Sequence, residues 1–242
     1  MSSIKGIIFD YGGTIDTDGI HWGELIWNEY RRACIDITHE EYREAYVHAE
    51  RYLAKNRAIE PTDTFRRLLE KKIAIQFDRL RETATGAELT PANEKMIAEG
   101  CYGRVKETLK RTCAIVEELS RRFPIVLVTN FYGNMPVVLE EFGLSEYFRT
   151  IVESSVVGLR KPDPALFSLG VEALGMRAED IAVVGDSYRK DIYPSSTLGC
   201  STVWLKNICW KEEPVINGHE PSATIKSLEE LPRAIDAIAK GL

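Results

Sequence analysis

An aspartate stands at the end of the first apolar run of this 242-residue sequence. Residues 7–14 read Ile-Ile-Phe-Asp-Tyr-Gly-Gly-Thr, so Asp10 follows a strand-like segment and precedes a tight turn. At the carboxyl edge of a parallel sheet, this position presents a carboxylate nucleophile to a phosphate. Two residues further on, where a proton-transferring side chain would help, the chain has only Gly12.

Two later motifs offer groups that could hold a phosphate. A second strand-like run ends in Thr129 and Asn130, and Lys161 precedes a predicted helix in the sequence Arg-Lys-Pro-Asp-Pro. Because a carboxylate and a phosphate repel each other, attack on phosphorus needs cations and hydrogen-bond donors nearby. We expect Lys161, the Thr129 hydroxyl, and the backbone N–H groups of Tyr11 and Asn130 to supply them.

A fourth motif adds carboxylates. Asp186 ends a further apolar run in Val-Gly-Asp-Ser, and Asp191 follows five residues later. A hard divalent cation such as Mg²⁺ prefers oxygen ligands. We therefore expect Asp10 and Asp186 to bind Mg²⁺ with one oxygen each, and Asp191 to hold Lys161 or a metal-bound water.

Five short runs rich in Ile and Val predict buried strands, because strands covered on both faces are apolar at consecutive positions. They span residues 4–9, 125–129, 149–153, 181–184 and 202–205. Helical patterns at residues 134–142, 164–174 and 189–198 suit right-handed crossovers, and a last helix is predicted at residues 227–239. The predicted fold class is therefore α/β, with a Rossmann-like parallel sheet and helices on both faces.

About 110 residues separate the first predicted strand from the second, far more than one crossover needs. Candidate helices in this segment span residues 21–33, 39–54, 63–77 and 91 onward, with a break marked by Gly86. A helix at residues 105–122 then returns to the sheet. We predict an all-helical domain at residues 17–100, inserted into a core domain of residues 1–16 and 101–242.

Composition limits the partners and the compartment. Hydrophobic residues make up 44% and charged residues 28%, as in ordinary globular proteins, and the net charge of −6 indicates neither nucleic-acid nor membrane binding. The five cysteines form no Cys-x-x-Cys pair, which favours free thiols in a reducing compartment. With no cleavable apolar segment at the start of the sequence, we expect a cytoplasmic monomer or homodimer.

Taken in order, the four motifs resemble those of the haloacid dehalogenase-like (HAD) hydrolase superfamily, and the resemblance covers the whole chain. The helical insertion resembles that superfamily's C1-type cap, and Tyr-Gly-Arg-Val at residues 102–105 resembles the point of re-entry into the core. The resemblance implies a Mg²⁺-dependent phosphatase that acts on a small phosphorylated metabolite through an aspartyl-phosphate. It also implies that the backbone carbonyl of Gly12 is a third metal ligand.

Gly12 is also where the sequence departs from the pattern, because typical phosphatases of the superfamily have a second aspartate there. That aspartate protonates the leaving alcohol and then activates water, which is worth roughly 10²- to 10⁴-fold in rate. One consequence would be a phosphatase that favours good leaving groups. Asp16, Asp18 and His21 are candidate substitutes that closure of the cap could bring to the site.

Two other functions remain open. A phosphonatase-like hydrolase of C–P bonds would form a Schiff base on a cap lysine. The candidates are Lys55, Lys71, Lys72 and Lys95; Lys55 has some apolar neighbours in the sequence, but its flanking residues do not match that family and favour a surface lysine. Alternatively, the protein is a binding or regulatory module that holds a phosphometabolite with little turnover. Dehalogenation is disfavoured, because dehalogenases of the superfamily need no metal and lack the Gly-Asp-Ser found at residues 185–187.

Overall fold

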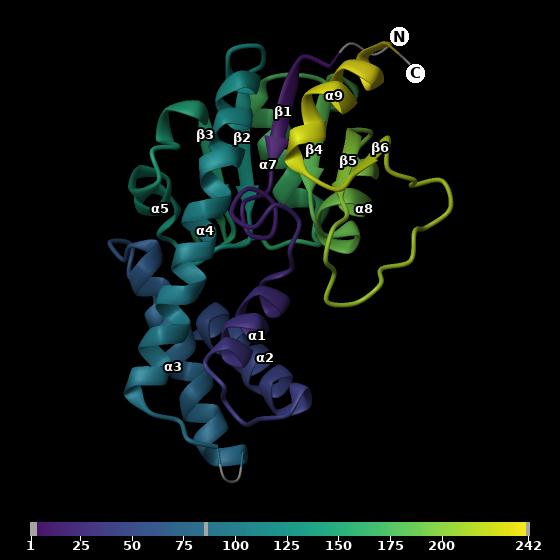
Figure 1. The fold of residues 1–242 in the computed structure, drawn as a ribbon. Helices are drawn as coiled ribbons and strands as arrows, with labels where there is room; N and C mark the ends of the chain where they lie inside the picture. Colours follow the sequence, from purple (N-terminus) through teal and green to yellow (C-terminus); the bar gives the residue numbers. More distant parts are fainter. Residues whose placement is uncertain (1–3, 85–86, 241–242) are drawn as a thin grey trace.

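Six parallel strands form the centre of the computed structural model, which describes residues 4–84 and 87–240 (Figure 1). Their order in the sheet is β3-β2-β1-β4-β5-β6. The strands are β1 (Gly6–Phe9), β2 (Ile125–Thr129), β3 (Thr150–Glu153), β4 (Ile181–Gly185), β5 (Ser201–Leu205) and β6 (Ala223–Ile225). The predicted α/β class is confirmed, and the short edge strand β6 is an addition to the five predicted strands.

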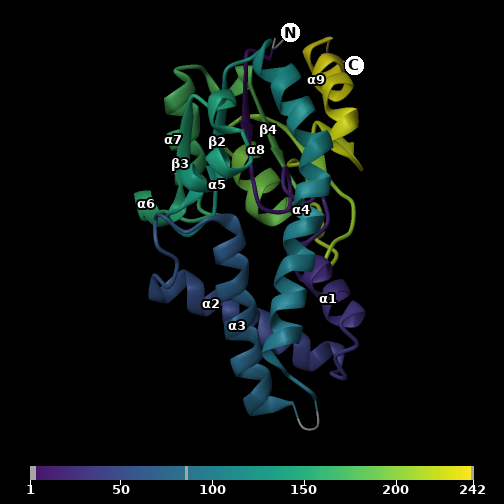
Figure 2. The same ribbon diagram turned by 60° about the vertical axis from the view of Figure 1, so that its left-hand side comes forward.

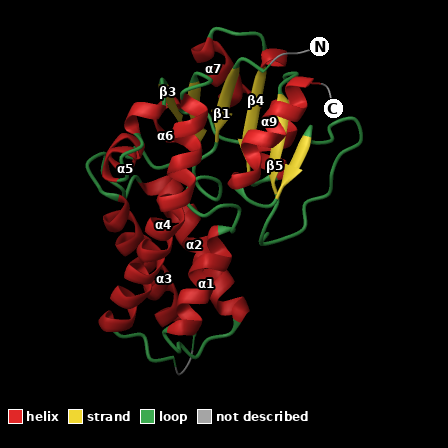
Figure 3. Ribbon diagram, turned by 45° about the horizontal axis from the view of Figure 1, so that its top comes forward, coloured by secondary structure: helices red, strands yellow, loops and turns green. Residues whose placement is uncertain are grey.

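Helices cover both faces of the sheet (Figure 3). Successive residues of β1 point to opposite faces, so that Ile7 and Phe9 join one core cluster and Ile8 joins another. The first cluster includes residues of α4 (Pro91–Ser120), α5 (Met135–Glu141) and α9 (Leu231–Lys240), and the second includes α7 (Pro164–Leu174). Two further helices of the core, α6 (Ser154–Val157) and α8 (Tyr193–Ser196), are short. Burial on both faces explains why the central strands β1, β2 and β4 are almost entirely apolar.

Three helices between β1 and β2 form a layer beyond the carboxyl ends of the strands (Figure 1). They are α1 (Trp22–Arg32), α2 (His39–Asn56) and α3 (Phe65–Thr83), which we call the insertion helices. Each begins where its sequence supplies a side-chain cap: Thr38 forms a capping box with Glu41, and Thr64 accepts from the backbone of the first turn of α3. The helical insertion therefore follows from local sequence.

Helix α4 connects this layer to the sheet without interruption (Figure 2). The sequence predicts one helix from residue 91 and another at residues 105–122, and the structure joins them into a single helix of 30 residues. The predicted domain boundary at residue 100 thus falls within a continuous helix. Gly86, where the sequence predicts a break, lies outside the described residues. None of the helices in the described parts of the chain has the length and apolar composition that crossing a membrane requires.

A long loop at residues 206–222, which we call the β5–β6 loop, also reaches the insertion helices (Figure 2). Its Ile208 forms a parallel bridge with Ile20, and the backbone N–H of His21 donates to the Ile208 carbonyl at 2.9 Å. The Trp210 ring lies directly on Gly23 of α1, where an added Cβ would come within 1.3 Å of the ring. The same ring stacks on Tyr46 of α2 at 4.9 Å between centroids.

Candidate active site

Three carboxylates meet at the carboxyl edge of the sheet. Asp10 follows β1 and Asp186 follows β4, and these strands are neighbours in the sheet, with Phe9 in register with Val184. Asp191 lies in a π-helical turn (Tyr188–Ile192) after β4, where the sequence predicts the first turn of an α-helix. One oxygen of each carboxylate lies within 4.8 Å of the others. The site therefore lies where parallel α/β sheets commonly bind ligands.

Lys161 holds two of these carboxylates. Its Nζ lies 2.7 Å from Asp10 Oδ1 and 2.7 Å from Asp191 Oδ1, with the lysine side chain only 2% exposed. Burial lowers the pKa of Lys161, but the two carboxylates outweigh that effect and raise it above its usual value, so the amine stays protonated. The Asn130 amide fixes the lysine backbone, because it accepts from Lys161 N at 2.9 Å and donates to Lys161 O at 3.2 Å.

Of the three carboxylates, Asp186 has the fewest groups that offset its negative charge, since Lys161 pairs with the other two. It accepts from the Thr14 hydroxyl at 3.2 Å, while burial and repulsion from Asp191 and Asp10 raise its pKa well above the usual range. The backbone comes close to it, since a Cβ added at Gly13 would lie 2.5 Å from its Oδ2. Clustered carboxylate oxygens with excess negative charge are a donor set that suits Mg²⁺. Asp10, Asp186 and the backbone of Gly12, which also lines the cavity, fit the expected site.

The expected phosphate-binding residues lie beside this cluster. Thr129 and Asn130 line the same cavity as Asp10 and Lys161. The side chain of Tyr11 is fully buried and packs edge-to-face on Phe65 and Phe131, at 6.3 and 5.9 Å between ring centroids. Because its side chain is held in this aromatic packing, Tyr11 can reach a phosphate only through its backbone N–H. Asn130 uses its side chain to position Lys161, so that its backbone N–H is the group left for phosphate.

Of the three substitutes for the missing acid, only His21 lines the cavity. Asp18 lies elsewhere, where its carboxylate accepts from Leu228 N at 2.7 Å and from the Ser227 hydroxyl at 3.0 Å. Burial lowers the pKa of His21 to about 4, and its Nδ1 accepts from Gly23 N at 3.0 Å, so the imidazole is neutral near pH 7. Asp18 therefore ties its loop to the C-terminal part of the core and does not line the cavity.

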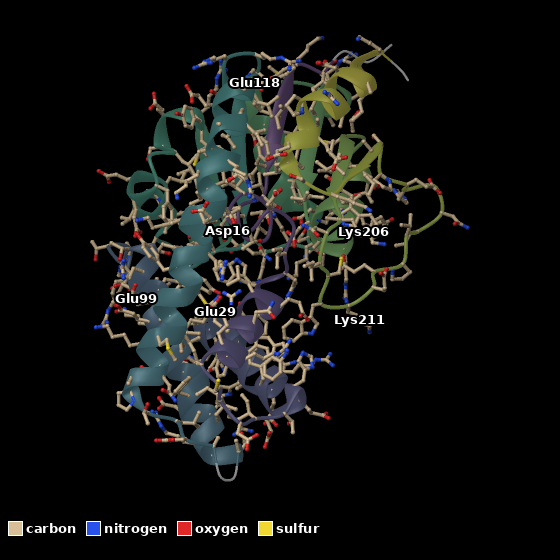
Figure 4. All side chains as sticks on the ribbon, viewed as in Figure 1. Asp16, Glu29, Glu99, Glu118, Lys206 and Lys211 are labelled. Carbon is tan, nitrogen blue, oxygen red and sulfur yellow. The ribbon has the colours of Figure 1, made fainter. Side chains whose placement is uncertain are left out.

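Asp16 is buried between the sheet and the insertion helices (Figure 4). Its carboxylate accepts from Gly13 N at 2.7 Å and from Trp22 Nε1 at 3.0 Å. Burial nevertheless raises the pKa of Asp16 to about 7, since desolvation outweighs the two donors. With both oxygens engaged, Asp16 shapes the turn after Asp10 and positions the Trp22 indole.

One lysine of the insertion helices lines the cavity, and it is Lys72. Lys55 is exposed in a separate surface groove, as expected for a surface lysine, Lys71 pairs with Asp63 at 2.5 Å, and Lys95 is exposed. The Lys72 Nζ lies 2.7 Å from Glu50 Oε1, and the carboxylate more than offsets burial and raises the pKa of Lys72. A Schiff base requires a neutral amine, so this pairing disfavours the phosphonatase-like alternative.

Several residues that line the cavity carried no recognisable signal in the sequence. They are Tyr46 and Glu50 of α2, Tyr132 after β2, and Trp210 of the β5–β6 loop. Of these, Tyr132 alone lies near a motif, three residues after Thr129. The others depend on how segments far apart in the sequence pack together.

Comparisons with known proteins agree with this geometry. A family model described as haloacid dehalogenase-like hydrolase matches residues 4–193. The chain belongs to this family. A second, HAD-hydrolase-like model matches residues 158–231, which include Lys161, Asp186 and Asp191. The predicted superfamily is thereby confirmed, and the HAD framework extends from β1 to the start of α9.

Several curated proteins are similar to the chain in sequence. Pyrimidine 5'-nucleotidase YjjG of Escherichia coli (strain K12) is 26% identical over 165 residues, covering 67% of this chain and 72% of that protein. Phosphoglycolate phosphatase of Vibrio parahaemolyticus is 32% identical over 132 residues, and phosphoserine phosphatase of Thermus thermophilus is 32% identical over 101 residues. The chain spans 54% and 41% of the length of the latter two.

Solved structures share the fold at low identity. HAD-hydrolase YfnB from Bacillus subtilis, bound to magnesium, superimposes with a TM-score of 0.59 at 18% identity, covering 97% of this chain and 99% of that one. The L-2-haloacid dehalogenase RSc1362 superimposes with a TM-score of 0.63 at 17% identity, covering 97% and 100%. These likenesses establish the HAD architecture.

Replacing Asp186 with Asn should remove the response of the protein to Mg²⁺. An ion present at 100 times its Kd stabilises the folded state by about 2.7 kcal/mol, so MgCl₂ should raise the Tm of the wild type by several degrees. In the Asp186→Asn variant this shift should vanish, while the Tm in a chelator should rise, because repulsion from Asp10 and Asp191 is relieved. Thermal unfolding with MgCl₂ or EDTA measures both effects.

Asp180→Asn is the matched control, since Asp180 lies at the other end of β4 and pairs with Lys5 and Arg177. It should keep the full Mg²⁺ shift. An undiminished shift in Asp186→Asn would exclude Asp186 as a ligand.

The buried Asp16 carboxyl should make stability depend on pH. Its pKa is about 7 in the folded state and near 4 when unfolded, so the folded state retains this proton more strongly. The stability of the wild type relative to Asp16→Asn should therefore be greatest below about pH 4, fall as the pH rises to about 7, and then level off. The slope should approach about 1.4 kcal/mol per pH unit. Urea unfolding in EDTA measures it, and a difference independent of pH would contradict the assignment.

Proposed function

We propose that this protein is a Mg²⁺-dependent phosphatase that hydrolyses the monoester of a small phosphorylated metabolite, with Asp10 as the nucleophile. The contact that carries this proposal is the buried Lys161 ammonium, 2.7 Å from Asp10, beside two further carboxylates that line the same cavity. The relatives named above are phosphatases and a nucleotidase, which supports the same type of reaction.

The proposed reaction has two displacements. In the first, an Asp10 carboxylate oxygen attacks phosphorus, the bond from phosphorus to the ester oxygen breaks, and an aspartyl-phosphate forms. Lys161 and Thr129 hold the phosphoryl oxygens, because the ammonium neutralises their charge and the hydroxyl donates to them. In the second, water attacks phosphorus, the bond to Asp10 breaks, and inorganic phosphate leaves.

Mg²⁺, when bound by Asp10, Asp186 and the Gly12 carbonyl, supplies positive charge that offsets repulsion between the carboxylate and the phosphoryl group. Asp191 acts through Lys161, whose Nζ it holds at 2.7 Å, and accepts from Ser187 N at 3.0 Å. It therefore keeps the lysine oriented toward Asp10.

The leaving group needs a proton that residue 12 cannot give. A Cβ added at Gly12 would have Trp22 Nε1 as its nearest neighbour, at 3.9 Å, so the space that an acid would occupy is open. The enzyme should consequently prefer phosphates whose leaving groups are stable without protonation, such as acyl or aryl phosphates. The alternative of a binding module makes the opposite prediction, namely phosphate binding without turnover.

Removing the nucleophile tests the reaction itself. Asp10→Asn should lower Mg²⁺-dependent hydrolysis of p-nitrophenyl phosphate to background, because a neutral amide cannot form the aspartyl-phosphate. Asp163→Asn is the control, since Asp163 is an exposed helix cap near Lys161 and Asn also caps helices. Equal turnover in wild type and Asp10→Asn would refute the mechanism, and phosphate binding without any turnover would indicate a module.

Restoring an acid at residue 12 tests the departure from the family pattern. If proton transfer limits turnover, Gly12→Asp should raise kcat for an alkyl phosphate by roughly 10²-fold or more, with little change for p-nitrophenyl phosphate. Gly12→Asn, of equal size but unable to transfer a proton, should leave both rates as they are in the wild type. Steady-state kinetics with Mg²⁺ measure the effect, and identical rates in the Asp and Asn variants would show that residue 12 does not limit the reaction.

A further inference from the structure

The cavity that contains Asp10 has a second wall, formed by the insertion helices. It encloses about 380 Å³, at the lower end of the roughly 300–1,000 Å³ typical of small-molecule sites. This wall is lined by Trp22, Tyr46, Glu50 and Lys72 of the insertion helices, and Tyr132, which follows β2, contacts the last two. A phosphate bound at Lys161 would direct its alcohol part toward this wall.

An ion pair is the polar centre of this wall. Lys72 of α3 lies 2.7 Å from Glu50 Oε1 of α2, and the Tyr132 hydroxyl donates to Glu50 Oε2 at 2.9 Å. The Lys72 ammonium also lies over the rings of Trp22 and Tyr132, at 5.7 and 5.3 Å from their centroids. Both charges are therefore held by several partners, and the pair as a whole is neutral.

The two partners differ in access to the cavity. The Lys72 side chain is 7% exposed, whereas that of Glu50 is 29% exposed. Because Glu50 Oε1 is buried against Lys72, Oε2, which accepts from the Tyr132 hydroxyl, is the carboxylate oxygen left for a ligand. An ionised carboxylate has acceptors only, so this oxygen can accept a hydrogen bond from a hydroxyl group, whereas another carboxylate would have no donor for it and would face it at closer range than the Lys72 ammonium behind it.

The rest of the wall is aromatic. Trp210 and His21 lie 5.1 Å apart between ring centroids, and Trp210 stacks on Tyr46. Such rings pack well against the C–H faces of a compact alcohol. The other cations that line the cavity, Arg160, Lys190 and Lys211, are exposed to solvent, so their attraction for an anion is screened.

We propose that Glu50, held by Lys72 and Tyr132, binds hydroxyl groups of the substrate's alcohol part, so that the substrate is the phosphate ester of a small, neutral polyhydroxylated alcohol. Phosphate esters of hydroxy acids are rejected by the same carboxylate. This inference rests on the proposed phosphatase function and names the substrate class that the site selects.

Glycerol 3-phosphate and 3-phosphoglycerate form a matched pair of probes, because they differ only in a hydroxymethyl group or a carboxylate. The wild type with Mg²⁺ should show a kcat/KM at least about tenfold higher for glycerol 3-phosphate. In Glu50→Gln this ratio should fall toward one, through loss with glycerol 3-phosphate and gain with 3-phosphoglycerate.

A double variant and a control variant separate the loss of the Glu50 carboxylate from misfolding and from effects common to all substrates. Glu50→Gln leaves Lys72 unpaired, so the double variant Glu50→Gln/Lys72→Gln tests the same loss in a neutral, polar wall. Glu44→Gln is the matched control, because Glu44 also lies on α2 and pairs with Arg79 of α3, but outside this cavity. It should retain the wild-type ratio. A wild type that prefers 3-phosphoglycerate, or equal losses for both substrates in the Glu50 variants, would overturn the proposal.

Binding separates this inference from the phosphatase reaction. In the Asp10→Asn protein, which should not turn over, titration of Trp fluorescence should show about tenfold tighter binding of glycerol 3-phosphate than of 3-phosphoglycerate. Equal affinities would overturn the substrate class even if p-nitrophenyl phosphate is hydrolysed. Selective binding by a wild type without any turnover would leave the Glu50 site standing and refute the phosphatase.

Discussion

Repulsion among three carboxylates is the constraint on which the site depends. Asp10, Asp186 and Asp191 bring oxygens within 4.8 Å of one another at a largely buried place, where charges interact strongly. Lys161 compensates one charge and contacts only Asp10 and Asp191. Two negative charges remain, and burial together with repulsion from Asp191 and Asp10 raises the pKa of Asp186 well above its usual range. A divalent cation would balance the charge of the cluster, which supports the proposal of a Mg²⁺ cofactor.

Two features of the fold hold the three carboxylates together: the order of the strands in the sheet, and glycines that let the backbone approach the carboxylates closely. β1 and β4 are neighbours, so the residues that follow them are adjacent although about 175 positions separate them. Gly13 and Gly185 let the backbone approach Asp186 and Asp191, because a Cβ at either position would lie 2.4–2.5 Å from the facing side chain. The β5–β6 loop also holds the segment after Asp186, since its Glu213 accepts from the Ser187 hydroxyl at 3.1 Å. The carboxylates of the site are thus positioned by the edge of the sheet and the backbone next to it.

The insertion helices contribute a different kind of surface. Their cavity wall is aromatic and neutral overall, with the pair of Glu50 and Lys72 as its polar centre. A buried ion pair adds little to stability compared with apolar packing, so its place on a cavity wall favours a role in recognition. Trp210 reaches this wall from the core and stacks on Tyr46, which connects the sheet to the helices at a second point besides α4. Reaction and selection would therefore lie on opposite sides of one cavity.

Local patterns in the sequence were sufficient for five strands, most helices, the HAD resemblance and the grouping of Asp10, Lys161 and Asp186, because strand ends in a parallel sheet meet at one edge. They did not reveal β6, which has three residues, or the unbroken α4, since both depend on neighbouring elements. Only the tertiary structure decided that Lys72 and not Lys55 lines the cavity, and that Glu50 pairs with it. The rotation of one helix against another and the path of a long loop result from packing between distant segments, which sequence periodicity alone does not specify.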